Sequence, residues 1–375
     1  MAFWQLLTLT QLLSSFLISA LASEGFICPA NCTCLPIQQH ILCPNASLTS
    51  IPSEMSNSTL ELYLQYNNFP ALSASFFPDL PKLSGLYLSN CNISSIGTGA
   101  FENLQTLKYL HLDNNLLRDL QSSAFQNLSS LLYLHLENNM LKSLNPGVFS
   151  ALKHLTALYL SHNLLTELSE GALSGMSQLR WLYLSNNQIS NISSKAFLDF
   201  TSLRKLSLDY NNLASVPLAI RSIVSLQVLN LSGNPIQKLT SVSFGRKLRF
   251  LEQLFLDQLA LQKITPLAFY WLRRLKILSL KNNHLEHSHL VVSRLSQVCF
   301  WRVNLWRCDC NLIWLYTWLQ IRKTQKEHSQ VKCSALMHSK DSCSQCGVTK
   351  ANLPTFWLGS HPANLQRCTW KPLRH

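Results

Sequence analysis

Aromatic and imidazole side chains recur along this sequence at intervals of 24 residues. The series consists of Tyr63, Tyr87, His111, His135, Tyr159 and Tyr183. Tyr109, Tyr133 and Trp181 stand two residues before members of this series, and Asp113, Glu137, Asp209 and Asp257 stand two residues after the same repeating position. Because Tyr and Trp often anchor interfaces, rings bordered by carboxylates predict a binding face for a long partner with apolar and basic groups. The alternative is that the rings only stack on their neighbours.

The sequence gives little indication of a metal site or of catalysis. His111 with His135, and His284 with His287 and His289, are spaced so that they could share a metal ion. Neither group has a matching set of carboxylates or cysteines, and the sequence contains no GxSxG, HExxH or phosphate-binding loop. We therefore expect no metal, no cofactor and no enzyme activity, and nucleic acid is not an expected partner.

A leucine pattern positions these side chains. The pattern L-x-x-L-x-L-x-x-N-x-L runs from Leu107 to Leu117 and returns from Leu131, Leu155, Leu179 and Leu203. Its asparagine column reads Asn67, Cys91, Asn115, Asn139, Asn163, Asn187, Asn211, Asn234, Leu259, Asn283 and Asn304. Within L-x-L both leucines point inward and the residue between them points outward, as in a strand. A buried asparagine can satisfy the backbone groups of the turn that follows.

The repeat predicts an α/β solenoid, a leucine-rich-repeat horseshoe with a parallel concave sheet and disulfide-bonded caps at both ends. We expect a signal peptide over residues 1–22, an N-terminal cysteine-rich cap over 23–58, about 10–11 coils over 59–303, and a C-terminal cap and tail over 304–375. The first segment is apolar and ends in Ala20-Leu21-Ala22, which is typical of a signal peptidase site. A membrane anchor is the alternative for this segment, and no other stretch is long enough to span a bilayer.

Ten of the 12 cysteines lie near the two ends of the chain, which favours disulfides in an exported protein. Zinc is the alternative for Cys343 and Cys346. Cys91 in the asparagine column and Cys299 at an inward leucine position are predicted to be buried free thiols. The sequons for N-glycosylation begin at Asn31, Asn45, Asn57, Asn92, Asn127, Asn191 and Asn230.

The net charge of +13 is unevenly distributed along the chain. From Lys238 onward there are 21 Lys and Arg against 6 Asp and Glu. The clusters that we predict to bind a glycosaminoglycan contain Arg246, Lys247, Arg249, Arg273, Arg274, Lys276, Arg322 and Lys323. Dense positive charge attracts sulfated polysaccharide over long range. A solvated surface that only aids solubility is the alternative.

The two cysteine clusters resemble the flanks of extracellular leucine-rich-repeat proteins. Three stretches, Asn67–Pro70, Leu88–Ile93 and Leu179–Ser185, together with the number of coils and the closing Arg374-His375, are similar to the small leucine-rich proteoglycan family, in particular its class IV. This resemblance implies a secreted matrix protein that binds collagen, supports cell adhesion, and has integrin and heparan sulfate as further partners. The chemistry of the aromatic face suits a collagen triple helix as well.

The resemblance also implies disulfide pairs and a cell-binding segment. The implied pairs are Cys28 with Cys34, Cys32 with Cys43, Cys308 with Cys333, Cys310 with Cys368, and Cys343 with Cys346. Either Cys343 or Cys346 could replace Cys368 as the partner of Cys310. The matching cell-binding residues are Trp318, Leu319 and Arg322, but Gln320 stands where the family has an acidic residue, and the basic tail is reduced to Lys371 and Arg374.

A second function from another class also fits such a solenoid. Proteins of this shape trap soluble protein ligands, such as growth factors or microbial products. Matrix attachment through collagen is the function that we expect, and a secreted trap is the alternative.

Overall fold

In the computed structural model, residues 26–265 and 267–285 are described, together with four short strands further along the chain. The chain forms two compact units. Unit 1 contains residues 1–187 and 195–202, and unit 2 contains residues 188–194 and 203–375. Each unit is a stack of coils whose strands pair in parallel, which confirms the predicted solenoid fold.

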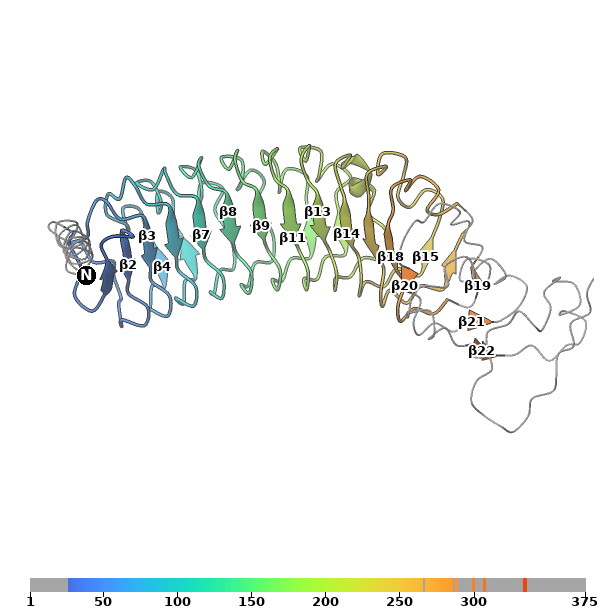
Figure 1. Cartoon of the computed structure of the whole chain (residues 1–375), viewed down its shortest axis with the longest axis horizontal. Helices are drawn as coiled ribbons and strands as arrows, with labels where there is room; N and C mark the ends of the chain where they lie inside the picture. The colour runs from blue at the N-terminus through green and yellow to red at the C-terminus, as the bar shows by residue number, and fades with distance from the viewer. Residues whose placement is uncertain are drawn as a thin grey trace, which may run out of the picture. The chain divides into compact units, whose positions relative to one another are not determined.

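Unit 1 places eight strands side by side in one sheet (Figure 1). These strands are β1 (Thr33–Leu35), β2 (His40–Leu42), β3 (Glu61–Tyr63), β5 (Gly85–Tyr87), β7 (Tyr109–His111), β8 (Tyr133–His135), β9 (Ala157–Tyr159) and β11 (Trp181–Tyr183). β1 and β2 are antiparallel, and every later pair is parallel. The register aligns equivalent residues of successive coils, so that Tyr63 faces Tyr87 and His111 faces His135. Three two-residue strands also belong to unit 1: β4 (Ala71–Leu72), β6 (Ser95–Ile96) and β10 (Glu167–Leu168).

Unit 2 repeats this arrangement in its own coils. Its main-sheet strands are β13 (Lys205–Ser207), β14 (Val228–Asn230), β16 (Gln253–Phe255), β18 (Ile277–Ser279) and β20 (Cys299–Phe300). Its other elements are β12 (Asn191–Ile192), the 3-10 helix η1 (Leu218–Ser222), β15 (Lys238–Leu239), β17 (Lys263–Ile264), β19 (His287–Ser288), β21 (Trp306–Arg307) and β22 (Cys333–Ala335). η1 is the only helix among the described residues, because coils of about 24 residues complete their return path with turns and two-residue strands.

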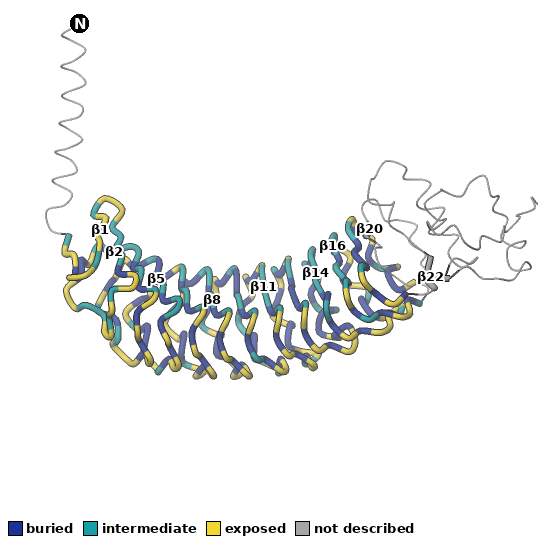
Figure 2. The backbone as a smooth tube through the Cα atoms, turned by 90° about the horizontal axis from the view of Figure 1, so that it is seen from below, coloured by how far each residue is buried: buried dark blue, intermediate teal, exposed yellow. Residues whose placement is uncertain are grey.

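Leucines fill the interior of the coils, and Figure 2 shows that buried backbone segments recur along the described chain. The inward strand residues Leu62, Leu86 and Leu110 are fully buried. On the return path a column of phenylalanines stacks from coil to coil, and the ring centroids of Phe101 and Phe125 lie 6.3 Å apart. Each coil therefore completes the apolar core of its neighbours, as a solenoid requires.

Buried asparagines connect successive coils, as the sequence pattern predicts. In unit 1, Asn115 donates from Nδ2 to the carbonyl oxygens of Leu88 and Leu112 at 2.8 and 3.0 Å. Its Oδ1 accepts from the N–H groups of Cys91 and Ile93 at 2.9 and 3.0 Å. The column asparagines are 1–7 % exposed, so these bonds satisfy backbone groups that water does not reach.

Two positions of the column depart from asparagine. Cys91 is fully buried and free, and its thiol donates to the carbonyl oxygen of Leu64 at 3.1 Å, in place of the bond that asparagine makes to the preceding coil. Burial raises the pKa of this thiol to about 11. At the second position Leu259 offers no acceptor, and the N–H of Ile236 donates instead to the carbonyl oxygen of Asn234 at 2.9 Å. At this position a backbone oxygen therefore takes the place of the side-chain acceptor.

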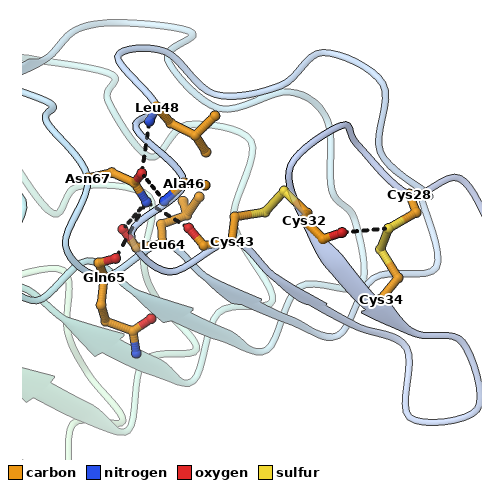
Figure 3. Close-up of a disulfide and its surroundings, with 9 residues drawn as sticks. All are labelled: Cys28, Cys32, Cys34, Cys43, Ala46, Leu48, Leu64, Gln65 and Asn67. Carbon is orange, nitrogen blue, oxygen red and sulfur yellow. Dashed lines mark hydrogen bonds between the residues drawn. A yellow bond between two sulfur atoms is a disulfide. The ribbon is translucent and has the colours of Figure 1, made fainter.

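The N-terminal cap is closed by the two disulfides that the resemblance implies, Cys28–Cys34 and Cys32–Cys43 (Figure 3). Asn67 of the first coil donates to the carbonyl oxygen of Cys43 at 2.8 Å. The same side chain accepts from the N–H of Leu48 at 2.9 Å. The cap is therefore hydrogen-bonded into the column that runs through the coils.

Several predictions fall on parts of the chain outside the described residues. These parts contain the proposed signal peptide and the side chains of Cys299, Cys308, Cys310, Cys333, Cys343, Cys346 and Cys368. The three C-terminal disulfide pairs therefore stay predictions.

Candidate ligand-binding face

Six rings form an unbroken stack on the outer face of the unit 1 sheet. We call Tyr63, Tyr87, His111, His135, Tyr159 and Tyr183 the ring column. Successive ring centroids lie 4.3, 4.7, 4.1, 4.1 and 4.8 Å apart, and the planes differ by 29° at most. The parallel register causes this arrangement, because the spacing of strands is close to the spacing of stacked rings.

A second row of rings stands beside the ring column. Tyr109 and Tyr133 stack at 5.3 Å, and Trp181 occupies the equivalent position on β11. Between them, Ala157 interrupts the row with a small buried side chain. The ring column and the second row together are the aromatic face, and all nine of its side chains are partly exposed.

Carboxylates border the aromatic face and hold its polar atoms. His135 Nδ1 lies 2.8 Å from Glu137 Oε1, and His111 Nδ1 lies 3.6 Å from Asp113 Oδ1. The other oxygen of Glu137 is buried and has no hydrogen-bond partner among the described residues. An unpaired buried acceptor is uncommon in folded proteins.

Contacts at the aromatic face shift the pKa values of Asp113 and Tyr63. Burial alone would raise the pKa of Asp113, but hydrogen bonds from His111, Ser89 and Asn114 outweigh burial and lower the pKa to about 2. Burial and the hydrogen bond to Glu61 raise the pKa of Tyr63. The face therefore keeps neutral phenols beside a charged carboxylate throughout the physiological pH range.

Glu61 and His40 belong to this surface and were not among the predicted site residues. Tyr63 donates a short hydrogen bond to Glu61, and Tyr87 Oη lies 3.5 Å from the same carboxylate oxygen. His40 Nε2 lies 3.9 Å from this oxygen, and its ring centroid lies 6.0 Å from that of Tyr63. Glu61 occupies the position equivalent to Tyr109, so the column spacing could have identified it. His40 lies in the cap, where no repeat spacing applies.

In unit 2, the strand positions that correspond to the ring column include two serines. Ser207 and Ser279 are buried, and their hydroxyls donate to Asp209 and Asp257, both at 2.6 Å. These two aspartates therefore have partners within their own sheet. The stacked surface predicted from the sequence is confined to unit 1 coils, where every outer residue carries a ring.

The histidines form no metal site among the residues that the structure describes. His111 and His135 stack face to face at 4.1 Å, each beside one carboxylate, and no cluster of three metal-ligating side chains is present in this part of the chain. His284 is exposed, and the side chains of His287 and His289 lie outside the described residues.

The basic clusters of unit 2 are exposed and partly ordered by rings. The guanidinium carbon of Arg246 lies 4.7 Å from the ring centroid of Trp271. Those of Arg249 and Arg274 lie 5.2 and 4.7 Å from the ring of Phe250. The remaining described members are Lys247, Arg273 and Lys276, and Lys276 pairs with Glu252 at 2.8 Å. Arg322 and Lys323 lie outside the described residues.

The sequons differ in how much of the asparagine is accessible. Asn31, Asn45, Asn57, Asn92, Asn127 and Asn191 are exposed. Asn230 is half-buried on the sheet face of unit 2, where its Oδ1 accepts from the N–H of Ser232 at 3.1 Å. Glycosylation at all seven positions stays a prediction, and Asn230 offers the least room for it.

The predicted cell-binding residues Trp318, Leu319 and Arg322 lie outside the described residues. The structure therefore describes the aromatic face within unit 1 and most of the basic clusters within unit 2, but not this segment. In the described part of the chain, no helix is long and apolar enough to cross a membrane.

Comparison with protein families identifies the repeats. The leucine rich repeat family matches residues 58–117, 105–165 and 153–213, and a two-copy model of leucine rich repeats matches residues 201–243. These ranges cover the ring column and the coils that contain β13 and β14.

Curated relatives match a shorter part of the chain. Chondroadherin of Homo sapiens is 41% identical over 75 residues, which are 20% of this chain and 21% of the relative. Chondroadherin of Rattus norvegicus is 39% identical over 82 residues, 22% of each protein. The chain thus spans about a fifth of the length of the curated relatives that it matches.

Solved structures show the same fold at low sequence identity. The mouse RP105/MD-1 complex contains a chain that aligns with a TM-score of 0.68 and 22% identity, over 79% of this chain and 51% of that one. A chain of the octameric complex of Latrophilin 3, Unc5D and FLRT2 aligns with a TM-score of 0.60 and 23% identity, over 82% of this chain and 94% of that one.

Proposed function

We propose that this chain, a chondroadherin-like leucine-rich-repeat protein, is a secreted protein of the extracellular matrix that binds collagen through its aromatic face. The observation that carries the proposal is the unbroken stack of six rings on unit 1. Stacked side chains are already ordered, so binding costs them little conformational entropy. Such a surface serves recognition rather than only packing.

The chemistry of collagen matches this surface. Collagen chains adopt polyproline II geometry, and aromatic grooves are the common way in which proteins recognise polyproline II segments. The ring column crosses five strand intervals of about 4.8 Å, or about 24 Å. That length equals about eight residues of a polyproline II chain at about 3.1 Å per residue. Glu61, Asp113 and Glu137 lie beside the rings and suit basic side chains of the partner.

The double variant Tyr159→Ala/Tyr183→Ala tests the proposal. These rings stack on each other at 4.8 Å and leave the leucine core untouched. We expect collagen affinity to fall by about 2 kcal/mol or more, the cost of losing interface anchors, while the melting temperature changes little. The measurement is solid-phase binding of the mature protein to fibrillar collagen, with circular dichroism to follow unfolding.

Tyr270→Ala is the matched control, because Tyr270 is an exposed tyrosine (53 %) outside the aromatic face. Its affinity should equal that of the unaltered protein. Undiminished collagen binding by the double variant would refute the aromatic face as the site. A panel of soluble growth factors belongs in the same experiment, and binding to one of these without binding to collagen would favour the trap.

A glycosaminoglycan is the second partner that we propose, and a specific observation favours it. Arg246, Arg249 and Arg274 lie over aromatic rings, so three guanidinium groups are held in place before a polyanion arrives. Neutralising Arg273, Arg274 and Lys276 should lower the salt concentration at which the protein elutes from heparin, because screening weakens such contacts. Neutralising the exposed Lys108, Lys142 and Lys153 of unit 1 is the control.

Cell adhesion completes the proposal and rests on resemblance alone. Trp318, Leu319 and Arg322 match the integrin-binding segment of the family. Attachment of cells to surfaces coated with the protein should fall in a Trp318→Ala/Arg322→Ala variant. Equal attachment would remove adhesion through this segment from the proposed function.

A further inference from the structure

A hollow of about 540 Å³ lies within unit 2, where the row of short strands is interrupted. β12 (Asn191–Ile192) and β15 (Lys238–Leu239) occupy equivalent positions in their coils. The coil between them has Ser215 at this position, and it forms no strand there. Pro217 follows two residues later and lacks the N–H that a ladder needs. The interruption leaves a pocket walled by segments of three coils.

The lining of this pocket is cationic. Arg221 and Lys238 both line it, and none of the lining residues is Asp or Glu. Neither cation forms a salt bridge with another residue in the described part of unit 2. Arg221 Nε is buried and finds no hydrogen-bond acceptor among these residues. Because a buried donor without a partner is costly, the pocket is suited to a ligand that supplies an anionic oxygen.

Packing holds Arg221 in place. It lies in the last turn of η1, and its Cδ and Cγ would be 3.1 and 3.2 Å from a Cβ added at Gly245. Gly245 has a φ of +66°, which glycine adopts without strain. A side chain at this position would displace the stem of Arg221, so the absence of one preserves the orientation of the guanidinium.

The rest of the lining combines hydroxyl groups with apolar surface. Ser190, Ser215 and Thr240 contribute hydroxyls, while Val216 and Pro217 contribute apolar atoms. Sugars present hydroxyls at their edges and C–H groups on their ring faces. A volume of about 540 Å³ falls within the usual range for small-ligand sites.

We infer that this pocket binds a sulfated sugar, with the sulfate ester at Arg221 and Lys238 and the ring against Val216 and Pro217. The pocket involves neither the aromatic face nor the ring-stacked arginines, so the inference goes beyond the proposed function. Loss of collagen or heparin binding in the variants above would leave it unaffected. A free inorganic sulfate offers the same oxyanion without the ring.

Calorimetric titration distinguishes these ligands. The probes are glucosamine 6-sulfate, glucosamine and sodium sulfate, at constant ionic strength. Asn191 lines the pocket and begins a sequon, so every protein in the experiment carries Asn191→Gln to exclude a glycan there. The sulfated sugar should bind about tenfold or more tightly than either other probe, because only it engages both walls.

Arg221→Gln should weaken binding of the sulfated sugar by about tenfold or more, the cost of a charge-assisted hydrogen bond. Lys238→Gln should weaken it in the same direction. Arg204→Gln, which removes an exposed arginine that neither lines the pocket nor belongs to the basic clusters, is the matched control and should leave binding unchanged. Circular dichroism establishes that each variant is folded.

Three results would overturn the inference. One is the absence of heat from glucosamine 6-sulfate with the otherwise unaltered protein. Another is equal affinity in folded Arg221→Gln and Arg204→Gln. Equal affinity for sodium sulfate and the sulfated sugar would exclude recognition of the ring.

Discussion

Replacing Asn115 by alanine tests how far the buried asparagine column stabilises the coils. Asn115 is 4 % exposed and its side chain hydrogen-bonds five backbone groups of two successive coils. Two of these are N–H groups, at Cys91 and Ile93, that donate to its side-chain oxygen. Alanine offers neither an acceptor nor a donor, so the two N–H groups and the carbonyl oxygen of Leu88 would lose this partner, whereas the carbonyl oxygen of Leu112 keeps Asn139 Nδ2 at 2.9 Å.

The expected cost follows from these contacts. A buried polar group left without a partner costs about 1–3 kcal/mol. The two N–H groups lose their only side-chain acceptor, and the carbonyl oxygens of Leu88 and Leu112 lose a donor. We expect Asn115→Ala to lower the free energy of unfolding by about 3–5 kcal/mol, with the two N–H groups as the main contribution. A change of this size is rare among single substitutions.

Equilibrium unfolding in urea measures the change in stability. Lys142→Ala is the control for a substitution at an exposed residue, and it should alter stability by less than about 0.5 kcal/mol. Cys91→Asn provides the converse test in the neighbouring coil, since asparagine keeps a donor for the carbonyl oxygen of Leu64 and should be tolerated. If Asn115→Ala costs no more than the Lys142 control, the argument that the column supplies essential hydrogen bonds is wrong.

Three further predictions concern a glycine, a thiol and a carboxylate. Gly175→Ala should lower the melting temperature more than Gly147→Ala, since both have positive φ but only at Gly175 would the new Cβ lie 2.9 Å from the backbone of Ser150; equal melting temperatures would contradict this. Cys91, with a pKa of about 11, should not react with iodoacetamide at pH 8 until the protein unfolds, which mass spectrometry detects. Because the pKa of Asp113 is lowered from 3.8 to about 2, its contribution of about 2 kcal/mol is present above pH 4 and is lost as the pH falls through 2. Asp113→Asn should therefore reduce stability at pH 5 but not at pH 2, as urea unfolding at both values can show.

The coil architecture could be predicted because every coil repeats the same physical requirement. Inward leucines and a buried asparagine recur at a fixed spacing. A residue's position in the repeat therefore predicts whether its side chain is buried in the core or lies on the outer face of the sheet. Leu259 shows where the pattern stops being informative. Leucine has no side-chain acceptor, and the N–H of Ile236 donates to the carbonyl oxygen of Asn234 instead. A backbone hydrogen bond that replaces a side-chain hydrogen bond cannot be predicted from the residue types alone.

One candidate site could be predicted from the sequence and the other could not. The ring column follows from position in the repeat, so its residues could be identified before the structure was known. The pocket around Arg221 could not, because it arises where a strand fails to form at Ser215 and it combines residues from three coils. The burial of Ser207 was also missed, since an outward position in a strand does not reveal that Asp209 folds back to accept its hydroxyl.

The antiparallel pairing of β1 with β2 has a consequence for self-association. An open edge of a parallel sheet is a template onto which another copy of the chain could add its own strand. In this protein the edge strand β1 is only three residues long and antiparallel to β2. It contains Cys34 of one disulfide and directly follows Cys32 of the other. The cap therefore offers a second molecule only a short edge constrained by disulfides, which disfavours strand addition at this end of the sheet.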